Sequence, residues 1–140
     1  MPLDPRRAEL LATLRGCIAS LEQRTTGDPA AIERFSLEDV AVRYWLQVAI
    51  QCCLDVGDSI LGELDLAEPG RYRDIFGALA HAGVIDASLV RPMEQLSDFR
   101  NALVHAYAGL NPNETWPRAS QGATVLSRFA EQIDRWERTH

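Results

Sequence analysis

The chain has 140 residues and a formal net charge of −6. This length fits one domain, spanning residues 1–140, and is enough to bury a hydrophobic core without disulfides or a structural metal. The acidic balance argues against a broad basic surface of the kind that binds nucleic acid, so any contact with RNA must be local, and we expect none with DNA.

We expect a cytoplasmic protein without membrane contact. No apolar run approaches the ~18–20 residues of a membrane-spanning helix, and Met1–Arg7 is not followed by the apolar core of a signal peptide. Cys17, Cys52 and Cys53 lack metal-binding spacing and fit buried small side chains. The histidines lie far apart and no carboxylates cluster, so we expect neither a metal nor a cofactor.

Near the N-terminus, apolar residues recur at three- and four-residue steps, which predicts an amphipathic helix near residues 5–24. Its apolar face comprises Leu3, Leu10, Leu14, Cys17 and Leu21, with Leu11 and Ile18 beside them. The segment Thr25–Pro29 breaks this pattern. Ser36, with Asp39 three residues later, resembles a capping box that opens the next helix.

That second helix should run from Leu37 to about Leu64. It has one narrow polar stripe, formed by Asp39, Arg43, Gln47, Gln51, Asp55 and Asp58. Most of the remaining circumference is apolar, and such a helix is buried on more than one side. Two explanations stay open: the second apolar side faces another subunit, or the helix is simply central.

A short helix is predicted around the apolar residues Tyr72, Ile75, Phe76 and Leu79. Gly83 should end it in a left-handed conformation, and His81, in its last turn, should be exposed or capping. Asp86 is placed to cap the following helix. Because Pro92 lies too deep for that helix to run undisturbed, either a single turn precedes it or the helix kinks there.

Pro117 is predicted to open the last helix. The apolar face of this helix comprises Ala119, Ala123, Leu126, Phe129, Ala130, Ile133 and Trp136. The patterns together predict four or five helices joined by short loops, which is an all-α up-down bundle.

The stretch that ends the fourth predicted helix places Arg100 five positions before His105, with four residues between them, and Tyr107 two positions after His105. An arginine presents a planar set of donors that suits a phosphate, and a histidine can take or give a proton near neutral pH. RNA supplies its own nucleophile, the 2′-hydroxyl, so this pair can cleave it without a metal, leaving a 2′,3′-cyclic phosphate and a 5′-hydroxyl.

On one straight helix, however, Arg100 and His105 leave the axis about 140° apart. They can meet at one phosphate if the helix loosens before His105, or if the stretch pairs with its copy across a dimer axis; we favour the second, with some loosening. A plainer interpretation pairs Arg100 with Glu94 or Asp98 and makes His105 an ordinary helix-end residue.

Arg100-Asn101-x-x-x-His105-x-Tyr107 resembles the Arg-x4-His-x-Tyr signature of the HepT-like toxins of the HEPN superfamily. Cys52–Gly57 resembles the middle of that family's second helix, and the segment from Pro69 to Phe76 resembles its third segment. The resemblance implies a homodimeric, metal-independent endoribonuclease of a toxin–antitoxin pair. Arg100 and His105 would be the catalytic pair, supported by Asn101.

The resemblance also implies a partner, a minimal nucleotidyltransferase antitoxin that transfers AMP to Tyr107. A competing hypothesis is a non-catalytic helical domain that docks with a nucleotidyltransferase or binds its substrate. The complete Arg–His–Tyr set favours the ribonuclease, because a docking module has no need of all three residues.

Overall fold

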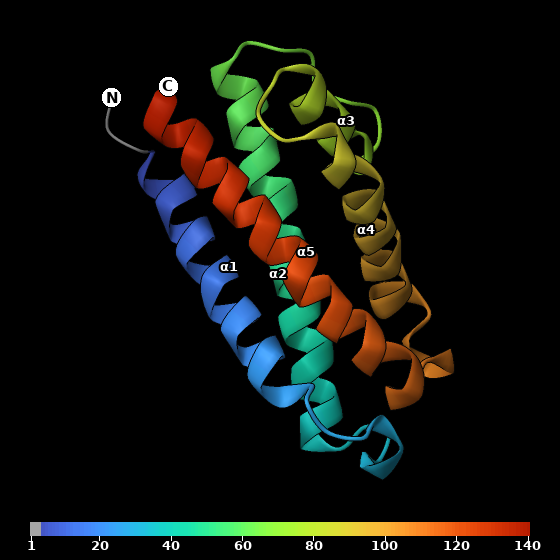
Figure 1. Cartoon of the computed structure of the whole chain (residues 1–140). Coiled ribbons are helices and arrows are strands. Elements are labelled where there is room, and N and C mark those ends of the chain that lie inside the picture. Colours follow the sequence, from blue (N-terminus) through green and yellow to red (C-terminus); the bar gives the residue numbers. More distant parts are fainter. Residues whose placement is uncertain (1–3) are drawn as a thin grey trace.

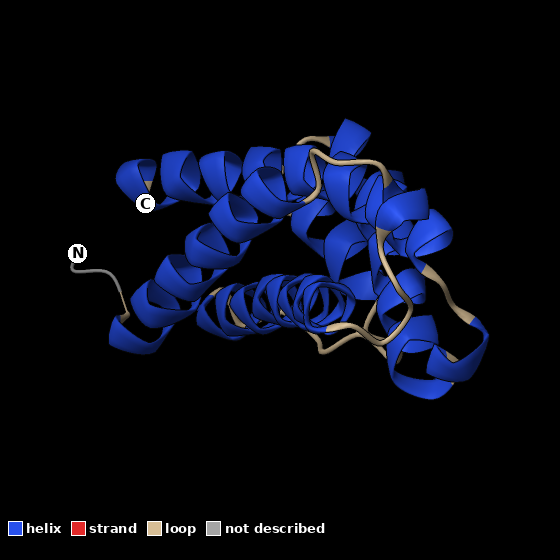
Figure 2. Cartoon of the chain, turned by 90° about the horizontal axis from the view of Figure 1, so that it is seen from below, coloured by secondary structure: helices blue, strands red, loops and turns tan. Residues whose placement is uncertain are grey.

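The computed structural model describes residues 4–140, and over this range it is all-helical, as predicted. The helices are α1 (Pro5–Arg24), α2 (Leu37–Glu63), α3 (Asp74–His81), α4 (Val90–His105) and α5 (Pro112–Thr139). The four longer helices lie alongside one another with their directions alternating, and the short α3 packs at one end (Figures 1 and 2). None of these helices is long and apolar enough to span a membrane.

Buried side chains from all five helices form one continuous apolar cluster. The predicted apolar faces of α1 and α5 are confirmed: Leu14, Cys17 and Leu21 are buried, as is every residue predicted for α5, while Leu10 lies at the rim. Leu3, assigned to the α1 face from the sequence, lies outside the described residues. Each helix therefore contributes the face that its periodicity indicates.

Helix α2 has two apolar sides, and the fold covers only one of them along the first half of the helix. Its core side packs against α1, α4 and α5. On the other side, Leu37 is 90% exposed and Tyr44 is 63% exposed, with Val40 between them. The central position of α2 thus explains only part of its apolar surface.

The short helix α3 lies very close to α2, and Gly57 allows this approach. A Cβ atom at Gly57 would lie 2.5 Å from Cγ2 of Ile75 and 3.1 Å from Cδ1 of Leu79. As predicted, Gly83 ends α3 in the left-handed region, with φ of +79°. The amide of Val84 then donates to the carbonyl of Leu79, which closes the helix end.

Two sequence predictions about helix starts are wrong. The first is that Asp86 caps the helix that follows it. Its side chain caps no helix; its carboxylate accepts from Nε2 of Gln132 and its amide donates to Oε1 of the same side chain, so it ties this loop to α5. A single 3₁₀ turn, Ala87–Leu89, precedes α4 and leaves Pro92 in the first helical turn. This is the first of the two alternatives, since a first-turn residue has no intrahelical amide bond to lose.

The second correction concerns the start of α5. The helix begins at Pro112, five residues before the predicted Pro117, which lies inside it. The carbonyl of Asn111 accepts the amides of Glu114 and Thr115, so the first turn is already formed there. Pro117 removes one amide donor near the helix start, and it lies on the exposed side.

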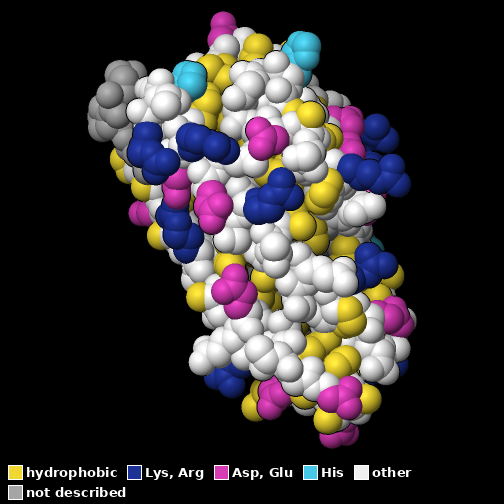
Figure 3. Space-filling model, viewed as in Figure 1, with side chains coloured by type: hydrophobic (Ala, Val, Ile, Leu, Met, Phe, Trp, Pro, Cys, Tyr) yellow, Lys and Arg dark blue, Asp and Glu magenta, His cyan; other side chains and the backbone are white. Residues whose placement is uncertain are grey.

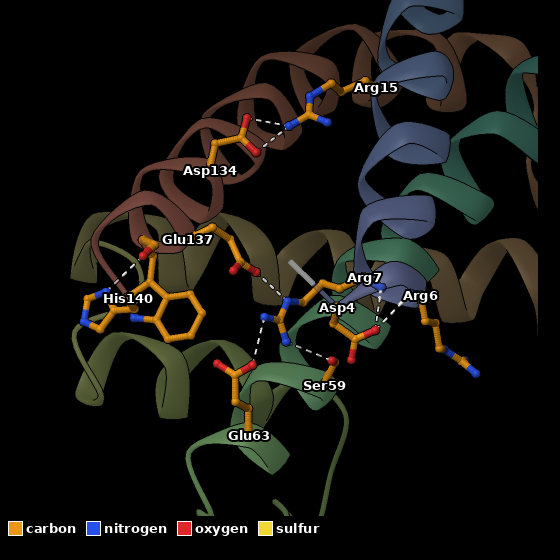
Figure 4. Close-up of polar contacts among 10 residues, drawn as sticks. Asp4, Arg6, Arg7, Arg15, Ser59, Glu63, Asp134, Glu137 and His140 are labelled. Carbon is orange, nitrogen blue, oxygen red and sulfur yellow. Dashed lines mark hydrogen bonds and ion pairs between the residues drawn. The ribbon is translucent and has the colours of Figure 1, made fainter. Parts of the chain in front are cut away.

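At the far end of the bundle, Arg7 joins three helices (Figure 4). Its guanidinium is 2% exposed and donates to Ser59 and Glu63 of α2 and to Glu137 of α5. It also lies 5.9 Å from the ring centroid of Trp136. A buried charge is costly unless it is fully paired. The network therefore fixes the start of α1 against the ends of α2 and α5.

Gly57→Ala should lower the free energy of unfolding by about 1–3 kcal/mol, because the added methyl overfills the contact with α3. Gly62→Ala is the matched control in the same helix: a Cβ there meets nothing within 4 Å, so the substitution should raise stability by about 0.5–1 kcal/mol. Urea denaturation measures both. Equal effects of the two substitutions would contradict the proposed role of Gly57.

Candidate active site

Helix α4 carries the Arg-His motif on its last turns and remains regular as far as His105. Ala106 then leaves the helical conformation, with φ of −119° and ψ of 24°, and a 3₁₀ turn, η3, covers Tyr107–Gly109. The helix therefore does not loosen before His105, as one of the two sequence alternatives required. Loosening begins only after it, so the side chains of Arg100 and His105 leave α4 about 140° apart.

Arg100 is half-buried and has no acidic partner. Among residues 4–140, no carboxylate lies within 4.0 Å of its guanidinium, and its buried Nε atom has no hydrogen-bond acceptor. Its one polar contact is from Nη1 to Oδ1 of Asn101, at 3.4 Å. A cation of this kind is available to bind an anion.

The two carboxylates that the plainer interpretation assigned to Arg100 are engaged elsewhere. Arg73, just before α3, lies 3.8 Å from Glu94 and 3.4 Å from Asp98. By pairing with both acids on α4, Arg73 leaves Arg100 without a competing counter-ion. That interpretation of Arg100 is therefore wrong.

His105 and Asn101 are exposed on the other side of α4. No hydrogen bond to the His105 ring is found within the part of the chain that the structure describes. Asp98 lies seven residues before His105, two turns back on the same face. His105 is thus open to solvent and to a substrate.

A groove of about 740 Å³ runs between α4 and the start of α5, on the His105 side of α4. Its lining includes Asp98 and Ala102 from α4 and Asn113 and Arg118 from α5. The guanidinium of Arg118 lies 4.7 Å from the ring centroid of Phe99, which also lines the groove. Phe99 itself is only 7% exposed, so Arg118 is the member of this pair that can contact a nucleotide.

Tyr107, in η3, is 57% exposed, but its backbone is held firmly by α2. Arg43 donates from Nη1 to the Tyr107 carbonyl at 3.1 Å and from Nη2 to the Leu110 carbonyl at 2.8 Å. Its Nε atom lies 3.1 Å from each carboxylate oxygen of Asp39. The side chain of Tyr107 is therefore exposed while its backbone is fixed.

The sequence reasoning missed this role of Arg43 and Asp39, which it placed only in a polar stripe. A signal was present: two opposite charges four residues apart, at the start of a helix that is otherwise apolar on most of its surface. Such a pair is either exposed or fully partnered. The partners lie 64 and 67 residues along the chain and are backbone carbonyls, so no side-chain motif identifies them.

The remaining candidate groups have no catalytic setting. All three cysteines are buried and free, and burial raises their thiol pKa values, that of Cys52 to about 11, so they are protonated at neutral pH. His81 is exposed in the last turn of α3, as predicted. Within residues 4–140, no three His, Cys, Asp or Glu side chains come together as metal ligands.

Comparison with known proteins gives consistent matches. A family model described as "Ribonuclease HepT-like" matches residues 14–133. The mRNA nuclease HepT of Shewanella oneidensis is 30% identical over 102 residues, covering 72% of this chain and 75% of that protein. The tRNA nuclease HepT of Aphanizomenon flos-aquae is 26% identical over 89 residues, covering 64% of this chain and 60% of that protein.

The fold has also been seen before. The tri-AMPylated HEPN toxin of Shewanella oneidensis, solved in complex with an MNT antitoxin, superposes with a TM-score of 0.83 at 23% identity. The match covers 95% of this chain and 99% of the solved one.

Proposed function

Because this chain belongs to the HepT-like ribonuclease family, we propose that it is the toxin of a toxin–antitoxin pair and that it cleaves RNA with Arg100 and His105. The observation that carries the proposal is the state of Arg100, a half-buried cation without a carboxylate partner, near the end of the helix that presents an open histidine.

In the proposed reaction, His105 accepts the proton of an RNA 2′-hydroxyl as that oxygen attacks the adjacent phosphorus. The bond from phosphorus to the 5′-oxygen breaks, and this leaving oxygen takes up a proton from solvent water, while His105 later returns its proton to solvent. Arg100 stabilises the extra negative charge on the phosphate oxygens during the displacement. Asn101, which accepts a hydrogen bond from Arg100, holds the guanidinium in place.

The groove between α4 and the start of α5 is the proposed path of the RNA strand. The protein is acidic overall, and on the face seen in Figure 3 acidic and basic side chains are interspersed instead of forming a stripe of one sign. Contact with RNA must therefore be short. Arg118, which lies over the buried Phe99 ring, supplies a cation at this groove that can contact a phosphate or stack on a base.

We further propose that two copies of the chain form one catalytic cleft. Within one chain the regular helix separates Arg100 and His105 by about 140°, whereas a two-fold axis near the end of α4 can bring Arg100 of one copy to His105 of the other. The uncovered face of α2, formed by Leu37, Val40 and Tyr44, is apolar and suits such an interface.

The chain should therefore be a dimer at micromolar concentration, which light scattering measures directly. Tyr44→Glu should shift it toward the monomer, because a carboxylate would be buried without a partner at the interface. Tyr72→Glu is the control, since Tyr72 is equally exposed, at 69%, but lies outside this face. A wild type that stays monomeric, or a Tyr72→Glu variant that dissociates equally, would contradict the proposed interface.

Wild-type protein should cleave RNA in the presence of a chelator, and Arg100→Ala and His105→Ala should each lower kcat by about 10²-fold or more. His81→Ala, which removes an exposed histidine at the end of α3, should leave the rate unchanged. Product analysis should find 2′,3′-cyclic phosphate ends. Full activity in His105→Ala, or loss of activity on chelation alone, would contradict the mechanism.

If the wild type binds a nucleotidyltransferase tightly yet cleaves no RNA, the chain is a docking or substrate-binding partner instead.

We propose that a partner nucleotidyltransferase silences this toxin by transferring AMP to Tyr107. The tyrosine is exposed and lies two residues beyond His105. Its AMP would place a negative phosphodiester and a bulky base at the mouth of the cleft, where the phosphate can occupy Arg100 and exclude RNA by charge and bulk.

Incubation with the partner transferase and ATP should add AMP-sized mass to the peptide containing Tyr107, and Tyr107→Phe should abolish it. The other two tyrosines, Tyr44 and Tyr72, are similarly exposed, at 63% and 69%, so Tyr44→Phe and Tyr72→Phe are matched controls that should still accept AMP. Mass spectrometry distinguishes these outcomes. Unchanged transfer to Tyr107→Phe, or inhibition without any added mass, would rule out this covalent switch.

A further inference from the structure

The buried pair of Arg43 and Asp39 links the start of α2 to the turn that follows the catalytic helix. Asp39 is fully buried and Arg43 is 9% exposed. The Nε atom of Arg43 is used by Asp39, and its two terminal nitrogens are used by the carbonyls of Tyr107 and Leu110. One planar guanidinium thus connects a carboxylate on one side with two backbone carbonyls on the other.

The turn has little else to hold it. Within η3 the amide of Gly109 donates to the Ala106 carbonyl at 3.1 Å, and the amide of Leu110 donates to the Tyr107 carbonyl at 3.3 Å. All side chains from His105 to Gly109 are exposed. Leu110, which follows the turn, packs partly buried against the apolar core. The contacts with Arg43 are the hydrogen bonds that tie the backbone of the turn to α2.

The chain also keeps a strained residue beside the pair. Phe35 has φ of +63°, in the left-handed region that a bulky side chain rarely adopts. In this conformation its amide donates to Oδ2 of Asp39 at 2.8 Å, and its ring centroid lies 5.2 Å from Cζ of Arg43. Strain of this kind persists only where the surroundings enforce it, and it is concentrated at functional sites.

A second buried arginine, Arg7, shows how the Arg43 contacts differ from those that only hold the helices of the bundle together. Arg7 is also buried and also bridges helices, but its partners are the side chains of Ser59, Glu63 and Glu137 at the opposite end of the bundle. Arg43, in contrast, holds the backbone of a segment that carries Tyr107 and directly follows His105.

We propose that Arg43, oriented by Asp39, is a positioning residue that fixes the end of α4 and the η3 turn, so that His105 is placed for catalysis and Tyr107 is presented for modification. The consequence for catalysis rests on the ribonuclease function proposed above, whereas the fixing of the turn does not. RNA cleavage by His105 and AMP transfer to Tyr107 would then both depend on the buried Arg43–Asp39 pair in α2.

The test uses two substitutions that avoid leaving an unpaired buried charge. Arg43→Lys keeps a cation for Asp39 but has a single ammonium group, which cannot also bridge the two carbonyls. The double variant Asp39→Asn/Arg43→Gln removes both charges together. Arg7→Lys is the matched control, since it weakens a buried arginine network away from the motif. All are compared at a temperature at which circular dichroism finds them folded.

Hydrogen exchange measured by mass spectrometry on the peptide spanning residues 106–111 reads the turn directly. Both Arg43 variants should exchange these amides about tenfold faster or more, the scale set by losing hydrogen bonds to a charged group. Arg7→Lys should exchange them at the wild-type rate. Steady-state cleavage should show kcat lowered by about 10- to 100-fold in the Arg43 variants, because misplacement of about 1 Å has effects of this size, with KM changed by less than about threefold.

Unchanged exchange in both Arg43 variants overturns the proposal, since the turn would then be held without the pair. Faster exchange with unchanged kcat and unchanged AMP transfer to Tyr107 overturns it as well, because the position of the turn would not matter. If wild-type protein cleaves no RNA, the ribonuclease proposal fails separately. The exchange rates and the rate of AMP transfer then still decide whether Arg43 positions Tyr107.

Discussion

The rotation of an α-helix by about 100° per residue is the constraint on which the whole site depends. His105 lies five positions after Arg100, and α4 is regular between them. One copy of the chain therefore directs its cation and its proton acceptor to different sides. The proposed second copy, related by two-fold symmetry, would remove this conflict without any change in the helix, because each residue would meet the complementary residue of its partner.

The second constraint is electrostatic, because an acidic protein must bind a polyanion. The structure meets this locally: Arg73 occupies Glu94 and Asp98, and the guanidinium of Arg100 is left without a carboxylate. The low accessibility of its Nε atom makes the charge more effective than one in open water. A small number of cations placed in this way can bind one or two phosphates without a basic surface.

The sequence was sufficient to predict those features of the fold that are set by local periodicity. The bounds of α1, the start of α2, and the left-handed end of α3 at Gly83 all follow from apolar spacing and turn chemistry. Asp86 was misjudged because its partner, Gln132, is 46 residues away. Pro117 was misjudged because Asn111 and Pro112 already form an adequate helix start.

The candidate site shows the same contrast between features set by local sequence and features set by distant contacts. Arg100, Asn101, His105 and Tyr107 could be named as candidates from the motif and its resemblance to a known family. The tertiary contacts that leave Arg100 without an acidic partner and hold the backbone of Tyr107 could not be predicted. Arg73, which occupies the nearby acids, belongs to another segment, and Arg43 acts on backbone carbonyls that carry no side-chain signature. Roles that depend on tertiary contacts with the backbone are not visible in a single sequence.

The central claim, that Arg100 and His105 act across two copies, is tested most directly by mixing the two inactive variants. Heterodimers of Arg100→Ala and His105→Ala chains, purified with two different tags, contain one Arg100–His105 pair with both residues intact and one pair with both removed. If the cleft is shared, each heterodimer should recover about half the wild-type rate of RNA cleavage. Heterodimers as inactive as either parent would contradict the account, because both residues would then act within one copy.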